Sequence, residues 1–235
     1  MKYVIVDERI PKKAIAALKD RGFLPFLLPS FKNLAQPVAS HPDMLMFFGD
    51  KIFCNREYFD AAKAEISAIS DALRLPIELG CEKISDEYPF DIAYNALSVG
   101  NFIFGKLDHL SPAVLKYAES RNLTLVDVKQ GYTKCSVCKV SESAIITADA
   151  SIKKAALVHG FDVLLIESGY ISLDGYPCGF IGGASGADTE NVYFCGNIEL
   201  HPDAERIKDF CKAHKKAAVS LSDEPLYDIG TMFFF

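Results

Sequence analysis

The chain has 235 residues, of which 50% are hydrophobic and 24% charged, with a net charge of −6 at pH 7. This hydrophobic fraction excludes intrinsic disorder, and the acidic balance without any Lys or Arg run longer than two argues against a nucleic-acid partner. No apolar stretch approaches the roughly 20 residues of a membrane helix, and an acidic start with seven scattered cysteines predicts a cytoplasmic protein without membrane association or disulfides.

Apolar runs typical of β-strands alternate with amphipathic helical patterns five times along the chain. Each predicted unit is strand, helix, strand, and a capping residue or proline marks each helix start. The helices are expected to begin near Pro11, Asn55, Ser111, either Asp149 or Ser151, and Pro202. The strands before and after them are predicted at residues 3–6 and 23–28, 51–54 and 75–79, 101–104 and 123–126, 144–147 and 161–166, and 192–195 and 217–221.

Units two to five carry a further strand-like run ahead of their first strand, joined to it by a hairpin turn. These runs cover residues 43–47, 91–96, 135–140 and 182–186. The first unit has no such run, but residues 228–235 form an apolar strand without a following helix. If that last strand completes the first unit, five modules close into one ring without unpaired ends.

The sequence therefore predicts a single α/β domain over residues 1–235. Its five ββαβ modules are expected at about residues 1–30 plus 228–235, 41–80, 90–128, 135–166 and 181–221. The other interpretation of the pattern is an ordinary doubly wound sheet with irregular spacing.

Four short motifs carry a resemblance to a known family: HPDM at 41–44, YNA at 94–96, GYTKCS at 131–136 and FIGGASG at 180–186. Together they resemble an uncharacterised bacterial family assigned to the pentein fold. That fold is a five-module α/β propeller with pseudo-fivefold symmetry, and it is the architecture of guanidino-group-modifying enzymes such as deiminases, dimethylarginine hydrolases and amidinotransferases. The resemblance implies that working residues lie at or near the starts of the first strands of the modules, which line a central channel.

The resemblance also implies a chemistry. A cysteine thiolate attacks the amidine carbon, carboxylates hold the planar cation, and a histidine moves protons to the leaving group. On this chain the implied nucleophile is Cys135 and the implied acid/base is His41, in a His-x-Asp motif. The candidate substrate-binding residues are Asp43, Asp91, Asn95, Lys134, Gly183 and Asp228. No metal and no other cofactor is expected.

Two features depart from the family pattern. The family nucleophile lies on the last module, whereas Cys135 lies on the fourth. Cation-binding carboxylates partly precede the family histidine, whereas the only acids at an earlier strand end are Asp7 and Glu8, where the strand enters its helix.

Each candidate also has a structural interpretation. His-Pro-Asp recurs at residues 201–203, where it is typical of a helix start, so His41 could be a turn residue. Cys135 and Cys138 have the spacing of half a zinc site, but no second pair follows, and both could be buried packing residues. The sequence also leaves open which of the two is the functional thiol.

Two functions follow. The first is a cysteine-dependent hydrolase or transferase acting on a small guanidino or amidine compound bound in the central channel. The alternative is a non-catalytic binding or scaffold protein that uses the same ring. The sequence decides neither the substrate, nor hydrolysis against transfer, nor whether the chain forms a homo-oligomer.

Overall fold

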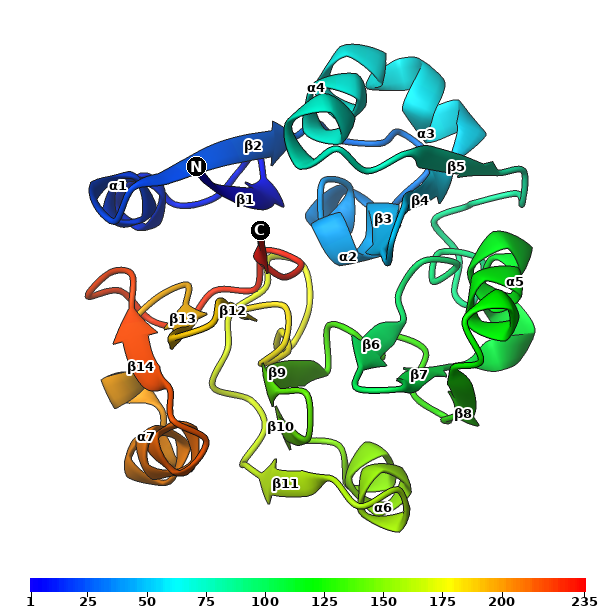
Figure 1. The fold of residues 1–235 in the computed structure, drawn as a ribbon. Helices are drawn as coiled ribbons and strands as arrows, with labels where there is room; N and C mark the ends of the chain where they lie inside the picture. The colour runs from blue at the N-terminus through cyan, green and yellow to red at the C-terminus, as the bar shows by residue number, and fades with distance from the viewer.

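The computed structural model describes residues 1–235 and has five sheets of three strands each, arranged as a ring (Figure 1). In every sheet the inner strand pairs antiparallel with the middle strand, and the outer strand pairs parallel with it. From inner to outer strand the sheets are β15 (Phe233–Phe234), β1 (Lys2–Asp7) and β2 (Phe23–Leu28); β3 (Met46–Phe48), β4 (Ile52–Asn55) and β5 (Ile77–Gly80); β6 (Leu97–Val99), β7 (Phe102–Gly105) and β8 (Thr124–Asp127); β9 (Val137–Ser141), β10 (Ala144–Thr147) and β11 (Asp162–Leu165); and β12 (Ser185–Ala187), β13 (Asn191–Phe194) and β14 (Ala217–Ser220).

The ring is closed by the last strand of the chain. β15 pairs antiparallel with β1, with Phe234 opposite Val4 and Phe233 opposite Ile5. Backbone hydrogen bonds of 2.9 Å in both directions join Tyr3 to Phe235. The predicted five-module ββαβ ring, completed by the C-terminal strand, is therefore confirmed.

A helix links the middle strand to the outer strand in each sheet, and these helices lie on the outside of the ring (Figure 1). The side chains of Asn55, Ser111 and Asp149 accept hydrogen bonds from backbone N–H groups of the first turn, which confirms the helix starts predicted there. The linking helices are α1 (Lys12–Asp20), α3 (Arg56–Ala61) with α4 (Lys63–Leu73), α5 (Pro112–Ser120), α6 (Ala150–Val158) and α7 (Ala204–Ala213), and the short helical turns are η1 (Gln36–Val38), α2 (Pro42–Leu45), η2 (Leu107–His109) and η3 (Ile198–Leu200).

The inner strands are shorter than the sequence predicts and begin later. They start at Met46, Leu97, Val137, Ser185 and Phe233, and the residues ahead of them form turns or, at 42–45, the helical turn α2. The predictions of strand at 43–45, 91–96, 135–136, 182–184 and 228–232 are therefore wrong. The side chains of Asn95 and Asp228 accept hydrogen bonds from backbone N–H groups in or near these turns. Because these N–H groups are already satisfied, they do not need a partner on a neighbouring strand.

Hydrophobic clusters join neighbouring modules. One cluster places Leu97 of β6 with Val137 of β9, another places Val140 of β9 with Phe194 of β13, and a third places Val4 of β1 with Tyr193 of β13. Each module therefore buries its apolar face against the next. None of the helices combines the length and the apolar character needed to cross a membrane.

Candidate functional site

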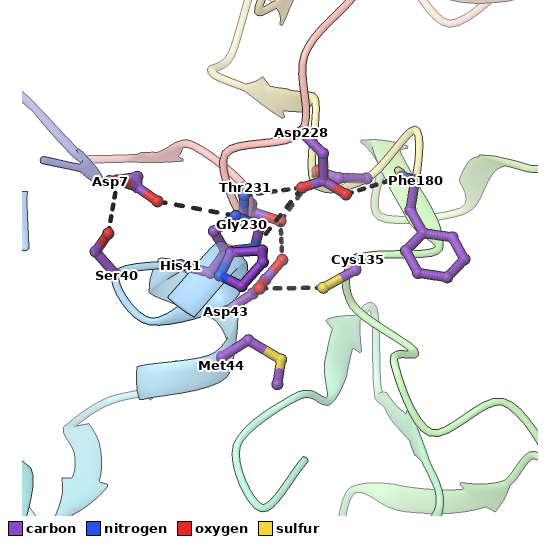
Figure 2. A network of polar contacts seen from close by, with 12 residues as sticks. Asp7, Ser40, His41, Asp43, Met44, Cys135, Phe180, Asp228, Gly230 and Thr231 are labelled. Carbon is purple, nitrogen blue, oxygen red and sulfur yellow. Dashed lines mark hydrogen bonds and ion pairs between the residues drawn. The ribbon is translucent and has the colours of Figure 1, made fainter. Parts of the chain in front are cut away.

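The turns that precede the inner strands bring together polar side chains from four of the five modules. Figure 2 shows those of His41, Asp43, Cys135, Asp228 and Thr231. All of them are buried, which is unusual for charged groups unless they are paired. Together with Asp7, from the end of β1, we call them the axial cluster, which consists of Asp7, His41, Asp43, Asn95, Lys134, Cys135, Asp228 and Thr231.

Cys135 lies in the turn before β9, and its thiol is in contact with two side chains. The Sγ atom donates to Asp43 Oδ1 at 3.1 Å and accepts from Asn95 Nδ2 at 3.0 Å. The amide oxygen of Asn95 accepts the backbone N–H groups of Lys134, at 2.7 Å, and Cys135, at 3.3 Å, so it fixes the turn that carries the thiol. Burial, reinforced by the carboxylates of Asp43 and Asp228, raises the pKa of the Cys135 thiol well above its usual range.

His41 lies between two carboxylates. Its Nε2 atom is 3.8 Å from Asp7 Oδ2, and its Nδ1 atom is 3.8 Å from Asp228 Oδ1. Although the ring is 2% exposed, Nδ1 has no hydrogen-bond partner. His201 also has a buried ring nitrogen without a partner, Nε2, so what distinguishes His41 is its position beside Asp7 and Asp228 (Figure 2).

Asp7 is held in place by its own partners. The guanidinium of Arg9 donates to both carboxylate oxygens, at 3.0 and 2.6 Å, and the Ser40 hydroxyl donates to Oδ1 at 2.7 Å. The sequence pattern places Asp7 at a strand end without assigning it a role, because its approach to His41 depends on the packing of the first module against the second.

Asp43 connects the thiol to a lysine. Its Oδ2 atom accepts from the Thr231 hydroxyl at 2.7 Å, and the Lys134 ammonium donates to that hydroxyl oxygen at 3.1 Å. Burial lowers the pKa of Lys134, while the charge of Asp43 opposes that shift. Thr231 is a member of the cluster that sequence reasoning missed, since an isolated threonine in a predicted strand gives no signal.

Asp228 closes the cluster from the C-terminal segment. Its carboxylate accepts the N–H groups of Phe180, at 2.8 Å, and Gly230, at 3.0 Å. Burial raises the pKa of Asp228, and the charge of His41 acts in the opposite direction. Gly183 packs directly against this carboxylate, and Gly230, at φ 67°, packs against His41, so neither position has room for a side chain.

Two predicted residues lie outside this network. Asp91 is buried, and its Oδ2 atom accepts from the Tyr132 hydroxyl at 2.7 Å, but no hydrogen bond or ion pair joins it to the axial cluster. Cys138 lies on β9 in the hydrophobic cluster shared with the fifth module. Of the thiols of Cys135 and Cys138, only that of Cys135 donates a hydrogen bond to Asp43.

The two His-Pro-Asp sequences differ in what their histidines contact. Both copies stand at a helix start, since α2 begins at Pro42 and α7 at Ala204, but only His201 caps its turn: its Nδ1 accepts the N–H of Asp203 at 3.0 Å. In the other copy the N–H of Asp43 donates instead to Gly230 O at 3.0 Å, which leaves the His41 ring free to face the carboxylates.

The axial cluster can stabilise a cation and hold a thiol beside it. Asp7 forms an ion pair with Arg9. Neither Asp43 nor Asp228 has such an arginine: the basic groups near them are Lys134, near Asp43, and His41, near Asp228. No group of three or more His, Cys, Asp or Glu side chains is arranged to hold a metal ion.

Comparison with known proteins adds the family and the fold. A family described as "Family of unknown function (DUF6873)" matches residues 5–233. The chain belongs to this family. No curated protein matches the sequence of this DUF6873 chain.

Solved structures share the architecture of this DUF6873 chain at low sequence identity. SxtG, an amidinotransferase from Microseira wollei in the saxitoxin biosynthetic pathway, has a TM-score of 0.56 and 11% identity over 94% of this chain and 88% of its own. DDAH from Pseudomonas aeruginosa, complexed with citrulline, has a TM-score of 0.57 and 11% identity, covering 94% and 92%. Agmatine deiminase from C. jejuni has a TM-score of 0.55 and 9% identity, covering 94% and 87%. The chain therefore has the pentein fold.

Proposed function

We propose that the axial cluster binds a small guanidino or amidine compound and that Cys135 attacks its central carbon, as a hydrolase or a transferase. The observation that carries this proposal is the contact of the Cys135 thiol with Asp43 in a buried group of carboxylates that also flanks His41. Amidinotransferase and deiminase structures with the same fold support it. Oligomeric state plays no part in it.

The chemistry assigns a role to each residue. The Cys135 Sγ atom bonds to the amidine carbon while its proton passes to Asp43 Oδ1, the acceptor already on the thiol. A proton carried by His41 passes to the departing nitrogen as the C–N bond breaks. In a hydrolase, the oxygen of water then bonds to the same carbon while one water proton passes to His41 and the other to solvent. The C–S bond breaks, and the sulfur takes back the proton held by Asp43. In a transferase an amine takes the place of water. Asp228 holds the cation by charge-assisted hydrogen bonds throughout, and Asp43 does so until it takes the thiol proton.

A second function has one observation in its favour. The Cys135 pKa is raised well above its usual range, and no hydrogen bond joins the thiol to His41, so the thiol in the unliganded protein is protonated. A non-catalytic protein that only binds a cation would keep the Cys135 thiol protonated. The catalytic proposal differs from it in requiring that a bound cation, by neutralising the carboxylates, favour the thiolate.

The two functions are separated by labelling with chloroacetamidine, a guanidinium-like electrophile, beside neutral iodoacetamide, followed by peptide mapping. Catalysis predicts that Cys135 reacts faster with the amidine reagent and loses this preference in His41→Ala. The matched control is His201→Ala, which removes the histidine of the other His-Pro-Asp sequence. Exposed Cys81 is the internal reference for reagent reactivity. If Cys135 reacts at equal rates with both reagents, or is not labelled at all, the catalytic proposal is wrong and the non-catalytic binding function is favoured.

A further inference from the structure

A cavity of about 690 Å³ lies along the axis of the ring. Its walls include residues of all five inner strands, β15, β3, β6, β9 and β12, so it is the open part of the central channel. Lys134 and Thr231 belong both to its wall and to the axial cluster. The cavity is within the range of about 300–1,000 Å³ that small-molecule sites occupy.

The wall combines aromatic rings with lysines. Phe47, Phe48, Phe233 and Phe234 contribute apolar surface from two neighbouring modules. Four lysines but only two acidic side chains line the same cavity, in a protein whose net charge is −6. The lysines are Lys2, Lys134, Lys139 and Lys216, and the acidic residues are Glu142 and Asp188.

Three of these lysines, Lys2, Lys134 and Lys216, have no ion pair with a carboxylate, and of the three Lys2 is exposed to solvent. Lys139 pairs with Glu142 at 2.6 Å, whereas Lys134 donates to the Thr231 hydroxyl and Lys216 to the backbone carbonyl of Asp188. Burial lowers the pKa of both Lys134 and Lys216, so their charged forms are incompletely solvated. An anion in the cavity would supply the missing partner, and a cation would be repelled.

We infer that this cavity binds an organic anion with an aromatic or comparably bulky apolar body, its carboxylate paired with Lys134 and Lys216 and its body packed against the phenylalanine rings. The Lys134 ammonium already lies 5.7 Å from the centre of the Phe233 ring, so charge recognition and ring packing meet at one point. This site shares Lys134 and Thr231 with the axial cluster, but it recognises the opposite charge and requires no reaction at Cys135.

The test is calorimetric titration of the full chain with 2-naphthoate, with 2-naphthylmethylammonium as a cation of the same ring system, and with inorganic phosphate as an anion without an apolar body. We expect 2-naphthoate to bind and the other two not to bind. Lys134→Met and Lys216→Met should each weaken 2-naphthoate binding about tenfold, the loss of one charge-assisted contact.

Lys154→Met, on the exposed face of α6, is the matched control and should bind as the parent does. Thermal unfolding checks that each variant is folded. If Lys134→Met does not fold, Lys216→Met alone tests the inference. The inference is overturned if the two naphthyl compounds bind equally, if phosphate competes fully with 2-naphthoate, or if the folded lysine variants bind like the parent. Chloroacetamidine labelling is a separate measurement, so its outcome does not affect this one.

Discussion

The Cys135 thiol shares its nearest carboxylate with the Thr231 hydroxyl. Both donate to Asp43, the thiol to Oδ1 and the hydroxyl to Oδ2. The charge of Asp43 and its hydrogen bond to the thiol both disfavour an anion on the sulfur. Burial is the largest cause of the raised pKa of Cys135, and Asp43 adds to it through its charge and its hydrogen bond.

Asp43→Asn should lower the pKa of the Cys135 thiol, because it removes a charge and an ionic hydrogen bond that both raise this pKa. The pH dependence of iodoacetamide alkylation at Cys135 should then shift to lower pH, since a larger thiolate fraction is present at each pH. Asp60→Asn, on the exposed surface of α3, should leave the profile unchanged. A profile that stays in place in Asp43→Asn would mean that burial alone controls the thiol.

Among the structural elements, α6 has the most fully satisfied N-terminus. Asp149 Oδ1 accepts the N–H groups of Ser151, at 2.7 Å, and Ile152, at 3.0 Å, together with the Ser151 hydroxyl at 2.6 Å. Burial raises the pKa of Asp149, but these hydrogen bonds outweigh it and lower the pKa below the ordinary value of 3.8. The ionised cap is therefore the form that stabilises the helix.

Asp149→Ala should reduce the free energy of unfolding by about 1 kcal/mol at neutral pH. Because the folded-state pKa is lowered, this contribution is present above the unfolded-state pKa and is lost as the pH falls through the folded value. The difference between parent and variant in urea unfolding should therefore shrink at pH values below 3.8, the ordinary pKa. A difference independent of pH would mean that the cap acts through packing.

Local signals explain what the sequence could predict about the elements. Asn55, Ser111 and Asp149 cap helices within three residues of themselves, so chain order alone indicates their roles. The inner strands start late because of contacts between modules: Asn95 reaches the turn at Cys135, and Asp228 reaches Phe180. Such contacts between residues distant in sequence leave no periodicity to detect.

The candidate site shows the same division. The positions of His41, Asp43, Asn95, Cys135 and Asp228 near one axis follow from the repeat and the resemblance, and the structure brings them together. Asp91, which has an equivalent position in the third module, pairs instead with Tyr132. The repeat brings a turn of each module near the axis, but side-chain packing decides which polar residues of these turns join the axial cluster.

At the scale of the whole molecule, β15 holds three modules together. Phe234 stacks on Tyr193 of the fifth sheet at 4.8 Å and meets Phe23 of the first at 5.0 Å, while Phe233 lies 4.8 Å from Phe48 of the second. Because the hydrophobic clusters also span neighbouring modules, we propose that the ring unfolds as one unit, as expected for a single domain.

Phe234→Ala should lower the free energy of unfolding by about 1–2 kcal/mol, because this half-buried ring packs against Tyr193 and Phe23. Urea unfolding followed by circular dichroism and by tyrosine fluorescence should give one coincident transition in parent and variant. Phe90→Ala, which truncates a side chain that is 56% exposed, is the control and should have little effect. Two separated transitions would mean that the modules form independent units.

The pairing of β15 with β1 has a consequence for how the chain is synthesised. The antiparallel partner of Val4 is Phe234, so the first sheet has an open inner edge until residue 234 has left the ribosome. The other four inner strands find their partners within one hairpin and need not wait. We therefore expect the nascent chain to depend longest on protection of this one edge, because an unpaired strand is a template for association with other chains.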